Sequence, residues 1–420
     1  MNTTLIKMAF RNLVKNQRRT LITLLGIAFG VMISILFTGL QDATWRETIN
    51  TAAELGAGHV VLQQKDYLDE PSVSNRLSRA DIIARMAAKD SRIRTVRERV
   101  VSHAMVATAA NSTSAMIYGI NPQTDTPDNT RLLKGKLVGK PLKSGDSQGV
   151  IIGAELAERL NLKPGQKLVY TLTDTNGEIV SALGRVRGVL HTGSRRVDQT
   201  LCMVDMNGLR RLLGYRATDV TQLAVFLTDY RDSKDVARAL SASLVTSSFA
   251  GTVQALPWET VNADLFGLVQ TKMASAHIFE LLILFLVAAG IFNTLYVSVM
   301  ERMREFGILN ALGFSRPRIF SLVIWESVFT AIGGLALALL VTAWPYYHMN
   351  TTGLDLAKMA ADGKEMVVND IAMNTVIHVD IYFEKLLSIL AVAAGATLLS
   401  GLYPAWRAGN VVPVESIKLV

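Results

Sequence analysis

Four long apolar stretches without a charged residue constrain the fold of this 420-residue chain more than any other feature. A helix needs about 20 residues to cross roughly 30 Å of hydrocarbon, because each residue adds about 1.5 Å. The core of a soluble protein would rarely need four uncharged runs of this length. We therefore predict four membrane-spanning helices around residues 20–41, 281–300, 327–347 and 386–406.

The positions of lysine and arginine predict the side of the membrane on which each connecting segment lies. Short segments rich in these residues remain in the cytoplasm. Residues 1–19 carry several basic residues and no acid, and residues 301–318 carry four arginines. Residues 348–385 instead hold more acids than lysines. We therefore expect a multi-pass protein of the bacterial inner membrane, with both termini and residues 301–318 in the cytoplasm and residues 42–280 outside.

The chain is accordingly predicted to alternate between membrane and extramembrane segments. The predicted segments are a cytoplasmic amphipathic helix at 1–19, spans at 20–41, 276–300, 319–347 and 385–406, a periplasmic domain at 42–275, a cytoplasmic helix at 301–318, a periplasmic loop at 348–384 and a cytoplasmic tail at 407–420.

Residues 42–275 are expected to form a large α/β domain with two lobes. Apolar runs of strand length, such as GVIIG and QLAVFLTD, alternate with helical patterns. Ser78 is expected to cap the helix that follows it, and Gly214 to end the helix MNGLRRLLG. The turn-rich segments 121–130 and 140–149 are expected to separate the lobes.

Residues 5–19 show an amphipathic helical pattern, with Ile6 and Phe10 on an apolar face and Lys7 and Arg11 on the opposite one. Such a helix can lie in the membrane interface with its cations near anionic headgroups, so membrane lipids are expected partners. The alternative is a solvated helix that docks on another protein.

The first predicted span contains Gly26 and Gly30, a GxxxG spacing that lets a neighbouring helix approach closely. The motif alone is weak, because glycine is common in membrane helices. Further glycines in the third and fourth spans support a tightly packed bundle. We expect a second copy or a related subunit to complete it.

The sequence contains no pattern typical of a nucleotide-hydrolysing or metal-dependent enzyme. Its nearest approach to a P-loop, at 135–141, is one residue short and has proline where Ser or Thr would hold magnesium. The six histidines are scattered, and the single Cys202 lies in an apolar run where an inert buried thiol is expected. We therefore expect no catalytic, cofactor-binding or metal site, and the net charge of +8 requires no nucleic-acid partner.

Glu326 lies in SLVIWESVF, about two turns inside the third predicted span if that helix begins near Ile319. A charge in a membrane helix is costly and usually faces the bundle or a partner. A proton relay would need further carboxylates at depth, and the uncharged stretches supply none. We expect a structural ion pair or an interfacial carboxylate, with a role in coupling as the alternative.

The segment ERMREFGILNALGFSRPR, at 301–318, predicts a short helix followed by a break. Gly313 suits the position after a helix end, Ser315 suits the cap of the next helix, and Pro317 suits its first turn. A connecting loop has no need of apolar residues at helical spacing. The pattern is typical of a helix that lies in a groove on a cytoplasmic partner.

Three segments resemble the MacB/LolC/LolE/FtsX superfamily of ABC transporter permeases. RMREFGILNALGFSRPRIFSLVIWESVFTAIGG is similar to its second-to-third-span segment, and GVIIGAELAERLNLKPGQKL to its periplasmic core. The tail YPAWRAGNVVPVES resembles its closing pattern through Pro404, Ala405, Arg407, Ala408, Pro413 and Glu415.

The resemblance implies a permease that acts as a homo- or heteromeric dimer and works with a separate cytoplasmic ABC ATPase subunit. ATP would be bound by that partner, and its motion would be transmitted through the helices to the periplasmic domains. The implied coupling residues are Arg304, Glu305, Phe306, Gly307, Ile308, Leu309, Leu312 and Gly313.

The resemblance leaves three functions open. An outer domain of about 230 residues favours the MacB or Lol branches over FtsX. MacB proper carries its ATPase at the N-terminus, whereas 19 residues precede the first predicted span here. We expect lipoprotein release of the LolC/LolE kind, or else MacB-like efflux, with a periplasmic carrier or adaptor protein as partner. The third possible function is that of an FtsX-like regulator of a periplasmic hydrolase. The 348–384 loop is longer than is usual in the MacB or Lol branches.

Overall fold

The computed structural model describes residues 2–15, 17–56, 58–126, 133, 135–245, 247–355, 367–368, 371–372 and 376–410. Pro413 and Glu415 of the tail motif lie outside the described residues. The chain separates into two compact units. The first, called the helical unit, holds the described residues up to Trp45, from Gln270 to residue 355 and from 376 to 410. The second, called the mixed unit, holds Arg46–Val269 and the short strands β12 (Val367–Val368) and β13 (Ile371–Ala372).

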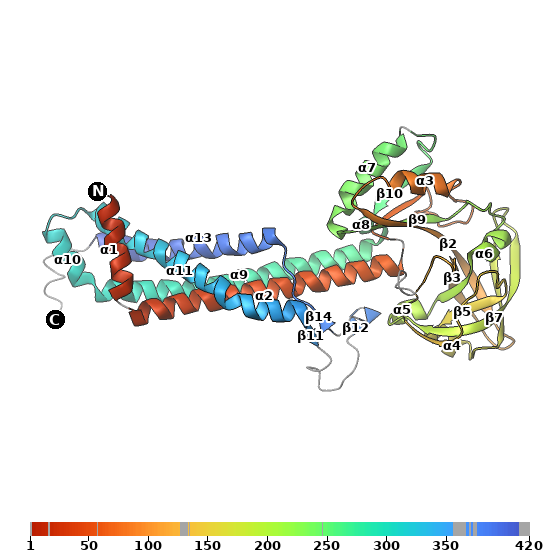
Figure 1. Ribbon diagram of the computed structural model, residues 1–420, viewed down its shortest axis with the longest axis horizontal. Helices are drawn as coiled ribbons and strands as arrows, with labels where there is room; N and C mark the ends of the chain where they lie inside the picture. Colours follow the sequence, from red (N-terminus) through yellow and green to blue (C-terminus); the bar gives the residue numbers. More distant parts are fainter. Residues whose placement is uncertain are drawn as a thin grey trace. The chain divides into compact units, whose positions relative to one another are not determined.

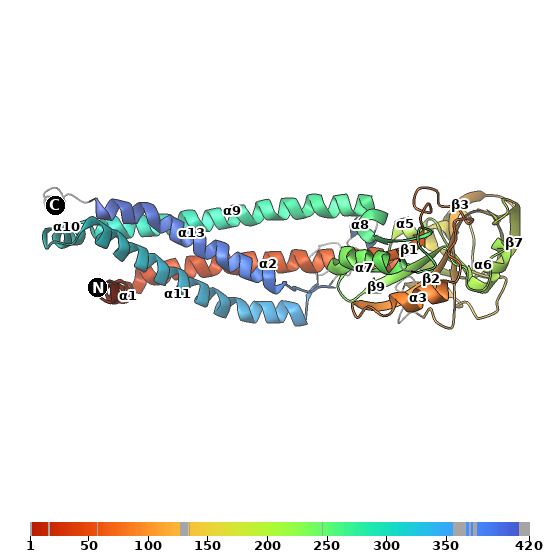
Figure 2. The same cartoon turned by 90° about the horizontal axis from the view of Figure 1, so that it is seen from above.

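Four helices are long and apolar enough to cross a membrane: α2 (Gln17–Leu55), α9 (Ala263–Glu301), α11 (Arg316–Thr351) and α13 (Phe383–Gly409). Each contains one of the four predicted spans, so the four-span prediction is confirmed. Their apolar segments lie side by side in both ribbon views (Figure 1, Figure 2). A shared core joins all four helices through residues such as Val31, Ile291, Ala338 and Ile389.

Glycines allow close helix contacts at several points in this bundle. A Cβ on Gly30 would lie 2.1 Å from Cγ2 of Val287 on α9, and one on Gly334 would lie 2.8 Å from Ile27 on α2. Gly26, in contrast, has no atom within 4 Å of its Cβ direction. The two glycines of the GxxxG motif therefore lie on different surfaces of α2. Gly30 packs inside the bundle, and Gly26 faces open space in this chain.

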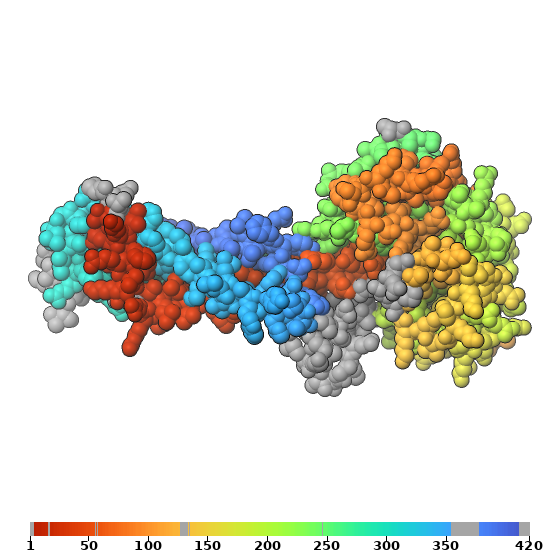
Figure 3. Space-filling model, viewed as in Figure 1, coloured from red at the N-terminus to blue at the C-terminus, as the bar shows by residue number. Residues whose placement is uncertain are grey.

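The N-terminal helix α1 (Asn2–Lys15) packs against α11, and Figure 3 shows its red surface directly against the blue surface of α11. The predicted single helix at 5–19 is instead divided, because α2 already begins at Gln17. Ala9 is buried, whereas Phe10 and Val14 are more than half exposed. Helix α1 thus docks on the chain itself, where Phe10 also contacts Phe329 of α11, while much of the apolar surface of Phe10 and Val14 stays uncovered.

The first lobe of the mixed unit has the βαββαβ order of a ferredoxin-like fold. Its strands lie in the order β10-β1-β9-β2, and every neighbouring pair is antiparallel. Helices α3 and α7 cover one face of this sheet (Figure 1), with Leu62, Ile83, Val225 and Leu240 in their common core. The elements are β1 (Val60–Gln64), α3 (Ala80–Ala87), β2 (Ile93–Ala107), β9 (Gln222–Leu227), the 3-10 turn η2 (Tyr230–Asp232), α7 (Ser233–Val245), β10 (Val253–Pro257) and α8 (Trp258–Val261).

The second lobe is a six-stranded barrel inserted between β2 and β9. Strand pairing closes the ring β2-β3-β8-β5-β7-β6 and returns to β2, while β4 extends β7. The elements are β3 (Ser112–Ile120), β4 (Lys136–Gly139), β5 (Gly149–Gly153), α4 (Ala154–Arg159), β6 (Lys167–Thr173), β7 (Ile179–His191), α5 (Arg195–Asp198), β8 (Leu201–Asp205) and α6 (Met206–Leu213).

The α/β prediction is confirmed, but the predicted lobe boundary was wrong. Residues on both sides of 121–130 and 140–149 belong to one barrel, since β3 pairs with β8 at Ile117 and Cys202. The lobes meet instead inside β2, whose first half pairs with β9 and whose second half pairs with β3 and β6. A single 15-residue strand shared by two sheets leaves no turn signal at the boundary.

Two helix-end predictions had different outcomes. Gly214 ends α6 at φ 74°, as expected. Ser78 does not cap α3, because Arg79 occupies the N-cap position at φ 58° and no side chain bonds to the first turn.

The described residues between α11 and α13 include two short antiparallel ladders. One pairs β11 (Leu354–Asp355) with β14 (Val376–Ile377), and the other pairs β12 with β13. Residues 356–366, 369–370 and 373–375 of the predicted loop lie outside the described residues.

Candidate functional site

The segment between α9 and α11 forms a short helix, α10 (Met303–Ala311), that ends in a complete capping motif. Gly313 has φ 93°, a left-handed conformation that glycine adopts without steric strain. Its N–H donates to the carbonyl of Asn310 at 3.0 Å, and the N–H of Phe314 donates to the carbonyl of Leu309 at 3.0 Å. These are the two bonds of a Schellman motif, so the predicted break at Gly313 is a defined turn.

Helix α11 begins at the predicted place. Ser315 occupies the N-cap position and Pro317 lies in the first turn. The side chain of Ser315 makes no capping hydrogen bond, so the predicted position is right and the predicted bond is absent.

The inner face of α10 belongs to the chain's own core. Phe306 is completely buried and Gly307 is also buried. Phe306 packs in one cluster with Ile319 of α11 and Ala405 of α13, and Leu309 lies against that cluster. The sequence resemblance placed Phe306 and Gly307 on a surface that meets the ATPase, whereas the structure makes them anchors of α10 on the bundle.

The outer face of α10 presents a short exposed stripe, formed by Arg304, Ile308 and Leu312. These residues are four apart, so they lie on the same side of a helix. Ile308 is 46% exposed and Leu312 is 74% exposed, and Arg304 is also exposed. This stripe is called the α10 stripe below. It is a part of the predicted coupling segment that another protein can reach, and Glu305 and Gly313 are exposed as well.

Arg302, immediately before α10, connects three parts of the helical unit. Its Nη1 donates to both carboxylate oxygens of Glu326 on α11, at 3.0 and 2.9 Å, and its Nε donates to Glu305 at 2.9 Å. Asn12 of α1 donates to Oε1 of Glu326 at 2.6 Å. The guanidinium also lies 5.0 Å from the ring centre of Phe306.

In this cluster of Asn12, Arg302, Glu305 and Glu326, Glu326 forms a buried ion pair with Arg302. Arg302 is 8% exposed and Glu326 is 7% exposed, so each charge depends on the other for compensation. Burial alone would lower the pKa of Arg302, but Glu326 and Glu305 raise it above its ordinary value. The guanidinium therefore remains charged, and the pair holds α10 and α11 together.

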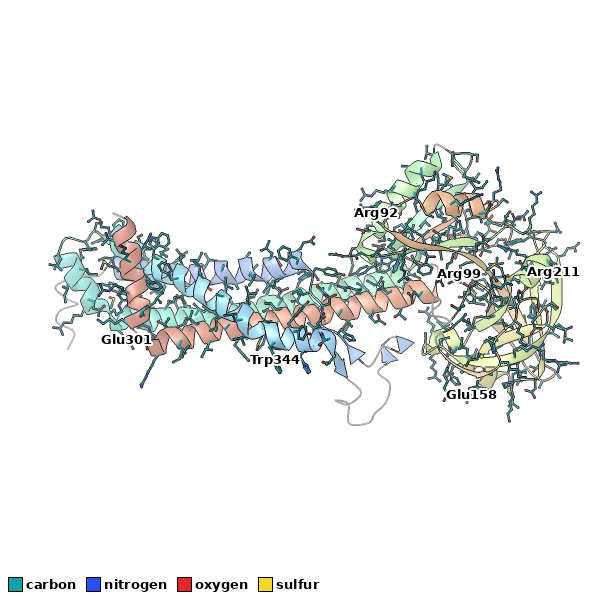
Figure 4. The ribbon with its side chains drawn as sticks, in the orientation of Figure 1. Arg92, Arg99, Glu158, Arg211, Glu301 and Trp344 are labelled. Atoms are coloured by element: carbon teal, nitrogen blue, oxygen red, sulfur yellow. The ribbon has the colours of Figure 1, made fainter. Side chains whose placement is uncertain are left out.

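Further ion pairs join helices within the same unit. Asp42 of α2, which is 4% exposed, pairs with Lys385 of α13. Arg19 of α2 lies 3.3 Å from Glu301, which is exposed at the end of α9 and labelled in Figure 4. The exposed pair contributes little to stability, because water screens it.

In the mixed unit, His59 fixes the end of α2 to the sheet. Its Nδ1 accepts a hydrogen bond from the N–H of Leu227 on β9 at 3.0 Å, so its Nε2 must carry the proton and donate to Asn50 of α2 at 2.9 Å. Burial lowers the pKa of His59 to about 4, with a further contribution from Arg94, while Asp229 acts in the opposite direction. The neutral tautomer is thus the one that this contact requires.

Within the described residues no group of three or more His, Cys, Asp or Glu side chains is placed to hold a metal ion. Cys202 is completely buried in β8, and burial raises the pKa of its thiol to about 12. The burial of Cys202 agrees with the inert thiol expected from the sequence.

Sequence reasoning identified Glu326 and the α10 region but missed Arg302 and Asn12 as its partners. In the sequence, Arg302 indicates only orientation, through its positive charge in the segment 301–318. Asn12 lies 314 positions from Glu326 in the sequence, so no local pattern links them.

Two family models match the chain. A MacB-like periplasmic core domain matches residues 20–243, more than half of the 420 residues, and an FtsX-like permease C-terminal domain matches residues 278–413. The chain belongs to the MacB/LolC/LolE/FtsX superfamily of ABC transporter permeases. Its mixed unit is accordingly a MacB-like periplasmic core domain between the first and second spans.

Relatives from both named branches are similar to this permease. The lipoprotein-releasing system transmembrane protein LolC of Xylella fastidiosa (strain 9a5c) is 24% identical over 410 residues, which cover 94% of this chain and 92% of the relative. The macrolide export ATP-binding/permease protein MacB of Escherichia coli is 23% identical over 340 residues, which cover 80% of this chain and 51% of the relative.

Two solved structures also match. The periplasmic region of MacB from Actinobacillus actinomycetemcomitans gives a TM-score of 0.35 at 18% identity, covering 51% of this chain and 95% of that one. The extracellular domain of the ABC-type transporter YknZ from Gram-positive bacteria gives 0.31 at 18% identity, covering 47% and 98%.

Proposed function

We propose that this permease is a non-catalytic subunit that couples ATP hydrolysis by a separate cytoplasmic ATPase to motion of its periplasmic domain. The observation that supports this most is the two-sided character of α10. Its inner face is anchored in the bundle through Phe306, and its outer face exposes the α10 stripe. A helix that is fixed on one side and exposes apolar side chains such as Ile308 and Leu312 on the other suits a groove on a partner protein.

The proposal places both termini and α10 in the cytoplasm and the mixed unit in the periplasm. The excess of basic residues in 1–19 and 301–318 supports this orientation. Phe10 and Val14, exposed on α1, would then lie in the inner membrane interface among lipids.

The Arg302–Glu326 pair gives the proposed coupling a physical route. A displacement of α10 acts on α11 through Glu326 and on α1 through Asn12. Helices α2 and α9 each contribute residues to both units, so movements within the bundle reach the periplasmic domain along continuous helices.

The permease is proposed to act as a dimer with a second copy or a related subunit. Leu281, Phe285 and Leu286 of α9 are each more than 60% exposed. Together with the uncovered Gly26, they provide apolar and small-residue surfaces that a neighbouring helix can cover.

The proposed cargo is a lipoprotein released from the inner membrane to a periplasmic carrier. The LolC relatives support this choice because the similarity extends over nearly the whole of both chains, whereas MacB is matched over about half of its length. Efflux through a periplasmic adaptor is the alternative that the MacB relatives support. Regulation of a periplasmic hydrolase is the third candidate function, and its support is the match to the FtsX-like permease C-terminal domain.

Reconstitution with the partner ATPase tests the proposal. Proteoliposomes that contain the complex and a lipoprotein should release the lipoprotein only when ATP and a periplasmic carrier are both supplied. ATP-dependent movement of a macrolide without lipoprotein release would favour efflux. Activation of an added hydrolase with neither cargo would favour regulation.

A further inference from the structure

The mixed unit contains a cavity of about 700 Å³ at the junction of its two lobes. Its floor is the face of the ferredoxin-like sheet that α3 and α7 leave uncovered, and barrel strands β3 and β6 contribute Tyr118 and Thr173. The segment after β1, from Tyr67 to Val73, forms a wall. This volume lies within the range of about 300–1,000 Å³ found for small-molecule sites.

The wall segment is fixed at both ends. Tyr67 bonds through its N–H to the carbonyl of Gln64 at 3.1 Å, and the hydroxyl of Tyr215 donates to the carbonyl of Val73 at 2.5 Å. Leu77 then forms a β-bridge with Val220. The cavity is therefore a formed feature of the unit.

Three polar side chains cross the floor in one row. The strand register places Gln63 of β1 opposite Gln222 of β9, and Gln222 opposite Arg99 of β2. Gln63 is completely buried and Arg99 is 5% exposed, although buried sheet surfaces are normally apolar. Gln222 donates to Gln63 at 3.4 Å, and Nε2 of Gln63 has no acceptor among the described residues.

Arg99 is the unusual member of this row. Its guanidinium makes no hydrogen bond or ion pair with any residue that the structure describes. Burial lowers the pKa of Arg99, while the charge of Asp125 raises it and the charge of Arg97 lowers it. A buried charge without a partner is strongly destabilising, so an external anion that supplies the counter-charge would stabilise this side chain. Figure 4 labels Arg99 on β2.

The rest of the lining indicates what kind of molecule fits. Val73, Val101 and Met116 add apolar surface beside Arg99, while Asp69 and Glu70 are exposed on the wall segment. The cavity thus offers one buried cation and an apolar wall, with acids only in exposed positions.

We propose that this cavity binds a small organic anion, a carboxylate or phosphate with a short apolar body. The guanidinium of Arg99 pairs with the anionic head, as its planar donors suit both groups. The apolar body contacts Val101 and Met116. This site is independent of the ATPase coupling proposed above.

Calorimetric titration of the full chain in a non-ionic detergent tests the proposal, with octanoate, octyl phosphate and octylamine as probes. Octanoate or octyl phosphate, or both, should bind saturably, and octylamine should not. Arg99→Gln should weaken that binding at least about tenfold, the loss expected for a charge-assisted bond. Arg211→Gln, which removes an exposed charge on α6 (Figure 4), should leave it unchanged.

Binding of octanoate alone identifies a carboxylate site, and binding of octyl phosphate alone a phosphate site. Equal binding of octylamine, or equal affinity in Arg99→Gln, would overturn the proposal. If Arg99→Gln fails to fold, hydrogen exchange of the wild-type chain decides the matter. The bound anion should then slow exchange in β1, β9 and the first half of β2, and unchanged exchange there would also overturn it.

Discussion

Arg302 donates from one nitrogen to both carboxylate oxygens of Glu326, at 3.0 and 2.9 Å, inside a helical bundle where both side chains are buried. Asn12 supplies a third member from the N-terminal helix. The sequence separations are 24 and 314 residues, so this contact exists only in the folded bundle. It ties the proposed coupling helix to two other helices.

The buried pair predicts a strong asymmetry between single and double variants. Glu326→Leu should destabilise the chain by about 3–5 kcal/mol, because Arg302 would keep a buried charge with no partner at that position. Arg302→Met combined with Glu326→Leu should recover most of this loss, since no uncompensated charge remains. Thermal unfolding in detergent measures both.

Glu301→Gln, which breaks the exposed pair with Arg19, is the control and should cost at most about 1 kcal/mol. A double variant as unstable as the single one would contradict the account.

The α10 stripe predicts that binding and folding can be separated on one helix. Leu312→Asp should reduce recovery of the ATPase subunit at least about tenfold, because a charge would enter an apolar contact. It should leave the melting temperature nearly unchanged, since Leu312 is 74% exposed. Phe306→Ala should instead lower stability by about 3–5 kcal/mol, as it empties a buried site.

Ile179→Asp, on an exposed position of β7, is the matched control for the charge. Normal ATPase recovery with Leu312→Asp would exclude the stripe as the contact.

His59 predicts a loss of stability in acid. Its pKa is near 4 in the folded state and near 6.5 when unfolded, so the unfolded chain binds more protons between these values. Stability is complete above about pH 6.5 and falls by about 3 kcal/mol as the pH approaches 4. His59→Gln should flatten this part of the profile, because glutamine does not titrate there. Unfolding midpoints measured from pH 7.5 to 4.5 test it, and identical profiles for the two proteins would show that His59 is not responsible.

Gly30 and Gly26 predict opposite responses to the same substitution. A Cβ on Gly30 meets Val287 at 2.1 Å, so Gly30→Ala should destabilise the bundle by about 1–3 kcal/mol. Gly26→Ala has no such neighbour and should leave the monomer intact. Val287→Ala should rescue Gly30→Ala. The measurement is thermal unfolding, together with light scattering to determine the oligomeric state. If the bulkier Gly26→Leu variant shifts the dimer towards monomer, a second copy packs on the face of Gly26. If Gly26→Ala destabilises the bundle as much as Gly30→Ala does, the proposed difference between the two glycines is contradicted.

The sequence was informative where local physics decides the structure. The four spans follow from the cost of burying charge in hydrocarbon, and the end of α10 follows from the backbone freedom of Gly313. The lobe boundary could not be predicted, because it lies inside β2 and depends on which distant strands pair with each half. The role of Phe306 was likewise hidden. Its apolar character indicates burial, but only the packing of α1, α11 and α13 shows that the chain itself covers it.

The central claim is that the outer face of α10 meets an ATP-binding subunit in the cytoplasm, and cysteine labelling at Leu312 tests it most directly. The native Cys202 is completely buried and its pKa is raised to about 12, so a Leu312→Cys chain offers a single reactive thiol. A membrane-impermeant maleimide should label it only after the cytoplasmic side is opened. The co-expressed ATPase should block that labelling, and a crosslinker at this cysteine should capture a subunit that binds a photoreactive ATP analogue. Labelling of Leu312→Cys from outside intact spheroplasts would contradict the account.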